Sequence, residues 1–187
     1  MIILTVDFAA KYSAGLVRGH GGEVHSQFDS LDKSSFDFLE LIVEHVNEYS
    51  PDIILIEDVP YGISSQAMTK PVLRLQGSLI LALRDHLDKV YFLNPSTWQK
   101  EFLGVARGKP AERVEAARMH AERLGYSPPD LVEAYKATVP EGKKILKKNT
   151  DPLAKVMTDY IDAFLMSEWA MERNGDFNIS GVQQVYT

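Results

Sequence analysis

Hydrophobic residues form short, nearly continuous runs in the first third of the chain, and two of these runs end in an acid. Residues 2–7 are apolar up to Asp7, and residues 52–57 are largely apolar up to Glu57. Runs of this length predict strands that are buried on both faces of a sheet. Two weaker runs at 14–17 and 24–28 flank a glycine-rich turn, so the first three strands are expected to form an antiparallel meander.

Between the later strands and after them, apolar residues follow helical spacing instead of continuous runs. Apolar residues from Phe36 to Val46 recur at helical intervals, and a helix joining the strands at 2–7 and 52–57 predicts that these strands pair in parallel. A longer helix is expected from about Thr69 to Asp88, with an apolar stripe wider than one sheet face needs. This stripe fits packing on a second copy of the chain, and equally a helix that is simply more buried than average.

The remaining elements complete an α/β domain with a five-stranded mixed sheet flanked by helices. A short strand at 90–93 is followed by helices at about 95–103, 110–124 and 151–169. The last of these is expected to have Asp151 as its N-cap and Pro152 at its first position. We therefore predict one domain over residues 1–173, with a long basic insertion around 125–150 that holds one short helix. Residues 174–187 are expected to be a tail.

Composition narrows the class of protein only a little. The chain has 187 residues, 45% of them hydrophobic and 25% charged, as in an ordinary globular domain. It has no cysteine, which excludes disulfides and thiolate metal sites and fits a reducing compartment. No apolar run approaches the roughly 20 residues of a membrane span. A cytoplasmic, intracellular location is expected.

The charge is unevenly distributed along the chain. The net charge is −6, yet residues 100–150 hold 11 Lys and Arg against 7 Asp and Glu. This segment is therefore basic, with a net charge of +4, and the rest of the chain carries −10. A polyanionic partner would meet the basic segment rather than the mean charge. A site built from carboxylates would account for part of the acidic excess.

The last long helix carries two acids, Asp159 and Asp162, which are three residues apart and therefore neighbours on its surface. Adjacent carboxylates repel one another, and the simplest interpretation is a face exposed to water. Met166 and Trp169 continue this side with apolar surface, however, which indicates that the face is not wholly exposed.

Four acids are expected to meet at one place. Asp7 and Glu57 end neighbouring parallel strands, and sites in open α/β sheets form beyond the carboxyl ends of such strands. A helix packed there brings Asp159 and Asp162 to the same edge. Four close carboxylates need cations, and Mg²⁺ or Mn²⁺ prefers oxygen ligands. Two such ions would suit the displacement at a phosphodiester.

The order of these acids resembles the RuvC-type Holliday junction resolvases of the ribonuclease H-like superfamily. The resemblance covers most of residues 1–171. It is carried by Leu4-Thr5-Val6-Asp7 followed by Gly15, by Ile54-Leu55-Ile56-Glu57, by Leu75-Gln76-Gly77, and by Asp159-Tyr160-Ile161-Asp162-Ala163. It implies a homodimeric, two-metal endonuclease for DNA recombination and repair, which nicks opposed strands of a four-way junction. It also implies that the long helix near Gln76 lies at the dimer interface.

The sequence departs from the family pattern in three places. The usual Asp-Pro-Gly after the first strand is Asp7-Phe8-Ala9 here. Family members often carry an aromatic wedge three residues after the glutamate, where this chain has Pro60, with Tyr61 next. The basic segment is longer than in compact cellular members and is similar to that of divergent phage versions, which act in the host cytoplasm.

Basic residues suggest where the phosphate backbone is held. Lys155 lies one turn before Asp159, where it can neutralise the acids, hold the scissile phosphate or simply form an i,i+4 ion pair. A wedge role is considered for Tyr61. Lysine and arginine side chains are candidates for contacts with the DNA backbone, and the alternative for each is a solvated surface: Arg107, Lys109, Arg113, Lys143, Lys144, Lys147 and Lys148.

Three other functions fit parts of the pattern. A nuclease for structured RNA would share the fold and the acids. A kinase or ATPase of the actin-like fold also begins with a strand-end aspartate, but Phe8-Ala9-Ala10 is a poor phosphate-binding turn. A non-catalytic junction-binding protein would bind branched DNA without cutting it. The expected function remains a metal-dependent, structure-selective DNA endonuclease that hydrolyses phosphodiesters in four-way and other branched DNA.

Overall fold

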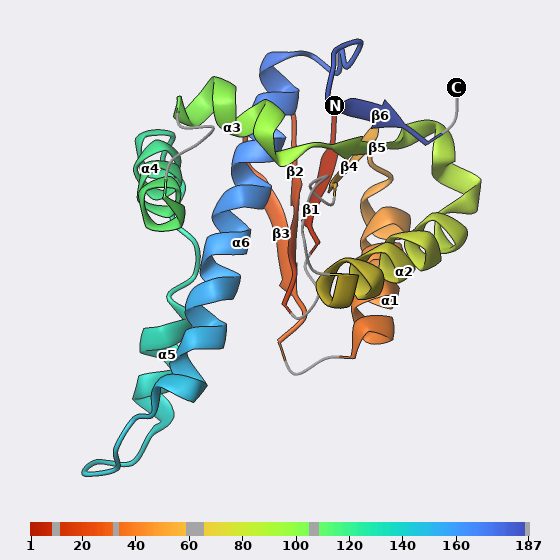
Figure 1. Ribbon diagram of the computed structural model, residues 1–187. Coiled ribbons are helices and arrows are strands. Elements are labelled where there is room, and N and C mark those ends of the chain that lie inside the picture. Colours follow the sequence, from red (N-terminus) through yellow and green to blue (C-terminus); the bar gives the residue numbers. More distant parts are fainter. Residues whose placement is uncertain (9–11, 32–33, 59–65, 105–108, 186–187) are drawn as a thin grey trace.

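The structure, a computed structural model, describes residues 1–8, 12–31, 34–58, 66–104 and 109–185. One mixed sheet lies at its centre, with the strand order β3-β2-β1-β4-β5-β6 (Figure 1). Helices cover both faces of this sheet, and a helical arm projects from one side of the body (Figure 1). No helix in the described ranges is both long enough and apolar enough to cross a membrane.

The strands pair as the sequence predicts over most of the sheet. β1 (Ile3–Asp7), β2 (Ala14–Arg18) and β3 (Val24–Asp29) form the antiparallel meander. β1 also pairs in parallel with β4 (Ile53–Glu57), which in turn pairs in parallel with β5 (Val90–Leu93). The mixed sheet and its parallel core are therefore confirmed.

The predicted strand number was wrong, because the sheet has six strands. β6 (Val182–Gln184) comes from the expected tail and pairs antiparallel with β5. Two backbone hydrogen bonds extend this pairing, from Asn94 N to the Gly181 carbonyl and from Val185 N to the Val90 carbonyl. Three residues with two glutamines have no hydrophobic pattern that would reveal such an edge strand.

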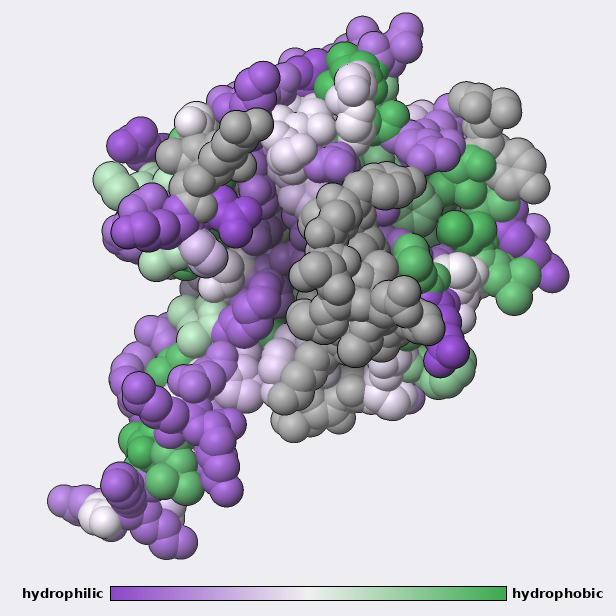
Figure 2. All heavy atoms as spheres, viewed as in Figure 1, coloured by the Kyte–Doolittle hydropathy of each residue, from purple (hydrophilic) through white to green (hydrophobic). Residues whose placement is uncertain are grey.

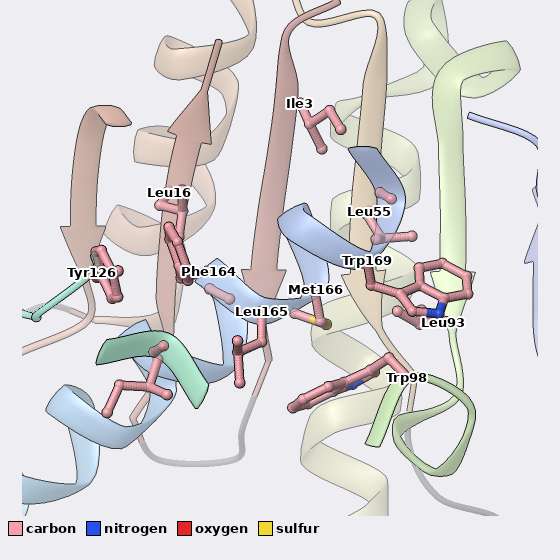
Figure 3. Close-up of a cluster of buried hydrophobic side chains, with 14 of the residues drawn as sticks. Ile3, Leu16, Leu55, Leu93, Trp98, Tyr126, Phe164, Leu165, Met166 and Trp169 are labelled. Carbon is pink, nitrogen blue, oxygen red and sulfur yellow. The ribbon is translucent and has the colours of Figure 1, made fainter. Parts of the chain in front are cut away.

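The apolar runs of the central strands supply two separate cores. Alternate residues of a strand point to opposite faces, so Ile3 joins one cluster while Leu4 and Val6 join the other. The first cluster, drawn in Figure 3, packs the sheet against α3 (Pro95–Leu103), α4 (Pro110–Arg123) and α6 (Lys147–Glu172). The second packs it against α1 (Ser35–Tyr49) and α2 (Gln66–Ala82).

The helix boundaries follow local chemistry. α1 begins with a capping box between Ser34 and Asp37 and ends at Tyr49, which is followed by the C-cap residue Ser50 with φ 47°. The helix expected to run to Asp88 ends earlier, and the 3₁₀ helix η1 (Arg84–Lys89) follows it. Phe36, expected on the buried stripe of α1, is 73% exposed.

The last helix begins earlier than its predicted cap at Asp151. α6 starts at Lys147, so Pro152 lies inside it rather than at its first position. The short helix expected in the basic segment is α5 (Leu131–Thr138), and it packs beside this extra turn of α6. Asn149 Nδ2 donates a hydrogen bond to the Tyr135 hydroxyl at 2.8 Å, which ties the two helices together.

Candidate active site

A cleft of about 380 Å³ opens at the carboxyl ends of β1 and β4. The strand ends contribute Asp7 and Glu57 to its lining, and α6 contributes Lys155 and Asp162. The wall opposite the strands is formed by α3 and α4, through residues such as Gln99 and Arg113. Figure 2, viewed from the same direction as Figure 1, shows a recessed hydrophilic band between the side that carries α4 and the body of the molecule. The cleft therefore combines charged and apolar side chains that are far apart in the sequence.

The two strand-end acids are placed side by side by the parallel pairing. Val6 is in register with Ile56, and Asp7 and Glu57 are the next residue on each strand. Asp7 is only 4% exposed. The Gln76 amide donates a hydrogen bond to the Glu57 carbonyl at 3.3 Å, which fixes the end of β4 against α2.

A hydrogen bond between β1 and α6 brings the helix acids to this edge. The Thr5 hydroxyl donates to the Ala163 carbonyl at 2.8 Å, and both residues are fully buried. Ala163 directly follows Asp162, so this bond sets the position of the acidic pair relative to the end of β1. Asp159 is completely buried, while Asp162 keeps access to the cleft.

The acids perturb one another strongly. Burial, followed by the negative charges of Asp7 and Asp162, raises the pKa of Glu57 well above its usual range. Burial and the charge of Asp7 raise the pKa of Asp159 to about 9 and that of Asp162 to about 8. Such mutual effects require short separations, so Glu57, Asp159 and Asp162 each lie near Asp7.

Two cationic side chains partly compensate this negative charge. Lys155 forms an ion pair with Asp159, one turn away on α6. Burial lowers the pKa of Lys155, but the carboxylates of Asp7, Asp159 and Asp162 outweigh this effect, and the pKa is raised overall. Arg113 of α4 lines the cleft and lowers the pKa of Asp162. Two cations do not balance the charge of four carboxylates, so further positive charge can be bound beside these acids.

The donor set fits hard divalent cations. All four acids offer oxygen ligands, which Mg²⁺ and Mn²⁺ prefer. Asp159 Oδ2 is buried and has no hydrogen-bond partner in the described part of the chain, although its other oxygen is paired with Lys155. Within those same residues, no three acidic or histidine side chains already converge on one point. Binding of an ion therefore requires the carboxylates to turn toward it.

The remaining predicted residues lie elsewhere. The side chains of Lys143, Lys144, Lys147 and Lys148 are exposed in the arm, outside the lining of the cleft. Lys109 is exposed just before α4, where its N–H donates to Glu112 at 3.1 Å. Tyr61 and Arg107 fall outside the described residues, so their roles stay predictions.

The sequence did not point to several residues that line the cleft. Phe8, Gln99 and Thr158 belong to this lining. Thr158 lies three residues after Lys155, so helical spacing offered a signal for it. Gln99 had none, because its position depends on how α3 packs across the sheet.

The fold is the one seen in RuvC. The structure of Thermus thermophilus RuvC in complex with a Holliday junction substrate matches with a TM-score of 0.59 and 12% identity, covering 94% of this chain and 97% of that one. A second Thermus thermophilus RuvC structure matches with a TM-score of 0.52 and 12% identity, over 91% and 98% of the two chains. The predicted resemblance is thus confirmed at the level of the fold.

A viral protein gives a weaker match. The fowlpox virus Holliday junction resolvase has a TM-score of 0.49 and 16% identity, covering 92% of this chain and 99% of that one. No model of a protein family and no curated protein matches the sequence.

Proposed function

We propose that this protein is a metal-dependent, structure-selective DNA endonuclease that resolves four-way junctions. The observation that carries the proposal is that Asp7 and Glu57, from two parallel strand ends, line one cleft with Asp162 of α6, while Asp159 is buried close to Asp7. The RuvC fold supports it. Acids that raise one another's pKa in a cleft are typical of functional sites, since a structural role gains nothing from their repulsion.

Asp7, Glu57, Asp159 and Asp162 would hold the divalent ions, two per active site. When bound, such ions activate the attacking water and stabilise the leaving oxygen of a phosphodiester. The chain itself supplies orientation and charge. Thr5 holds α6 against β1, which keeps the helix acids beside the strand acids. Lys155 and Arg113 line the cleft and are placed to attract the scissile phosphate.

A homodimer is part of this proposal, because cutting both opposed strands of a junction requires two active sites. An apolar groove of about 540 Å³ runs between α1 and α2. α2 is the helix that carries Gln76, which the resemblance to the resolvases puts at the dimer interface. The exposed large side chains of the groove include Phe36, at 73%, and Leu81, at 71%. Apolar surface of this kind marks an interaction site, and we assign it to a second copy of the chain.

The test is a cleavage assay on a labelled four-way DNA junction, beside linear duplex, forked DNA and structured RNA. Reactions would contain Mg²⁺, Mn²⁺ or a chelator, and Asp162→Asn would serve as the site variant. Symmetric nicks in the junction that need the metal and vanish in the variant are expected. Cleavage of RNA alone would keep the site but change the substrate. Junction binding without cleavage under any condition would overturn the nuclease assignment.

A further inference from the structure

The arm, residues 131–152, is a hairpin formed by α5, a turn and the first turns of α6. It projects from the body beyond the sheet, and its end is largely hydrophilic (Figures 1 and 2). At its base, Leu131 packs with the cluster that contains Val156 and Tyr160. Further out, Asn149 bonds to Tyr135. The arm is thus attached firmly to the domain and is more than an extended loop.

The tip of the arm, residues 139–148, concentrates positive charge. A turn closes it, with Lys143 N donating to the Pro140 carbonyl at 3.1 Å and Gly142 adopting φ +81°. The tip has one acid, Glu141, against four exposed lysines. None of these lysines forms an ion pair within the described residues, whereas Lys136, lower on the arm, is paired with Glu133. Among the described residues of the arm, the basic side chains without an ion pair are therefore confined to the tip.

Apolar side chains separate the two lysine pairs. Ile145 and Leu146 lie between Lys143-Lys144 and Lys147-Lys148, and they are 37% and 41% exposed. A tip whose only task was to stay solvated would have no use for two large aliphatic side chains at this position. Cations on both sides of an apolar pair match the edge of a DNA groove, where phosphates flank the sugars.

A single helix connects the tip to the active site. α6 carries Lys147 at its first position and Asp159 twelve residues later. At a rise of 1.5 Å per residue, these positions are ~18 Å apart along the helix axis. One turn of B-DNA spans about 34–36 Å, so a duplex that lies along the axis of α6 would be spanned over about half a turn, or roughly five base pairs.

We propose that the tip is a second DNA-binding site, which holds a duplex arm of the substrate about five base pairs from the phosphate that is cut. Its lysines contact backbone phosphates on both sides of a groove, and Ile145 and Leu146 contact the sugars between them. This inference rests on the proposed nuclease function and extends it. Because tip and acids share one helix, the contact fixes the position of the duplex relative to the cleft.

Site-directed crosslinking tests the position of the contact. The chain has no native cysteine, so Ile145→Cys can carry a unique photoreactive group, in an Asp162→Asn background that prevents cutting. Crosslinks are expected on one duplex arm, about five base pairs from the scissile phosphate. Asn47→Cys, exposed at the end of α1, is the matched control and should give none. Absence of crosslinks from the tip, or equal crosslinking from both positions, would overturn the proposal.

Salt dependence tests the charges. Replacing the four tip lysines with Gln should lower the magnitude of the slope of log affinity against log salt by up to about 3.6, since each phosphate contact contributes about 0.9. Ile145→Ser with Leu146→Ser should weaken binding about tenfold at an unchanged slope. Arg84→Gln, an exposed cation before β5, should change neither quantity.

Salt-dependent binding and metal-dependent cleavage, measured on the same proteins, separate the tip contact from the proposed nuclease function. An unchanged slope in the four-lysine variant, while the wild type cuts junctions with metal, would refute the tip contact and leave the nuclease intact. A slope that depends on the tip, in a protein that never cuts, would keep the contact and refute the nuclease.

Discussion

At the scale of single residues, the site holds several carboxyl groups close together, where burial prevents water from screening their repulsion. Burial and mutual repulsion raise the pKa of Glu57, Asp159 and Asp162, and within the described part of the chain Lys155 and Arg113 compensate from the cleft. Asp159 makes the point most clearly, because one of its oxygens is buried and has no hydrogen-bond partner among the residues that the structure describes. Holding these acids together therefore lowers the stability of the metal-free protein, as is expected of the cation site that we propose.

Removing any one acid should abolish cleavage and leave folding intact. Asp7→Asn, Glu57→Gln, Asp159→Asn and Asp162→Asn are each expected to lower the rate by at least about 100-fold, as loss of one charge-stabilising group commonly does. Junction binding should persist or tighten, because each change removes a negative charge near phosphates. Asp151→Asn, exposed two turns earlier on α6, is the control. Two acid variants cutting at the wild-type rate would refute the site.

The raised pKa values predict how stability changes with pH when no metal is bound. Asp159 and Asp162 titrate near 9 and 8 in the folded protein, against about 3.9 when unfolded. The folded state therefore binds more protons between these limits, and stability falls as the pH rises from about 4 to 9.

Thermal unfolding in a chelator should show this effect. The free energy of unfolding is expected to fall by more than about 1 kcal/mol from pH 5 to pH 9 through these groups, or about 2–4 °C in Tm. Asp159→Asn should flatten the dependence, and saturating Mg²⁺ should raise Tm most at high pH. A Tm that rises steadily to pH 9 in the chelator, equally in wild type and variant, would contradict the raised pKa values.

At the scale of elements, the sequence predicted the strands and helices that have a periodic hydrophobic pattern. It did not predict boundaries and positions that depend on tertiary contacts. The runs ending in Asp7 and Glu57 determined two parallel strands, and the helical spacing around Asp159 and Asp162 determined α6, so the four acids could be found from sequence. The start of α6 could not, because α5 packs against the extra turn at Lys147. Nor could the lining residue Gln99 be found, since its place depends on the packing of α3.

The contact between β1 and α6 should matter for both stability and rate. Thr5→Val keeps the shape but removes the buried bond to the Ala163 carbonyl, which should cost about 1 kcal/mol in the free energy of unfolding. Cleavage should also slow, by up to about 100-fold, because small displacements of catalytic groups are expensive.

Chemical denaturation and single-turnover cleavage would measure the two effects. Thr138→Val is the control, since its hydroxyl bonds to the Tyr135 carbonyl on the exposed surface of α5. If Thr5→Val cuts at the wild-type rate, the bond stabilises the fold without positioning the acids.

At the scale of the whole molecule, we assign proposed roles to two surfaces outside the cleft, the basic tip and the apolar groove between α1 and α2. The groove leads to a prediction about assembly. Phe36→Glu with Leu81→Glu should convert a dimer to a monomer in light scattering, because charges would be buried at the interface, while folding persists at these exposed positions.

The same variant should change the products formed from a junction. A monomer is expected to leave single nicks where the dimer makes paired ones. Met119→Glu, on the exposed face of α4, is the matched control and should stay dimeric. A wild-type protein that is monomeric at micromolar concentration would remove the role assigned to the groove.

The strand from the tail has a consequence for handling the protein. β6 covers one side of β5, and the Gln184 amide also donates to the Asp88 carbonyl at 2.6 Å. A chain shortened to residue 173 would keep all four acids yet leave the Val90 carbonyl and the Asn94 N–H without their partners on the β6 side of β5. Exposed edge strands of this kind recruit strands from neighbouring molecules. Trimming this segment would therefore invite self-association, and a fused tag belongs after a spacer.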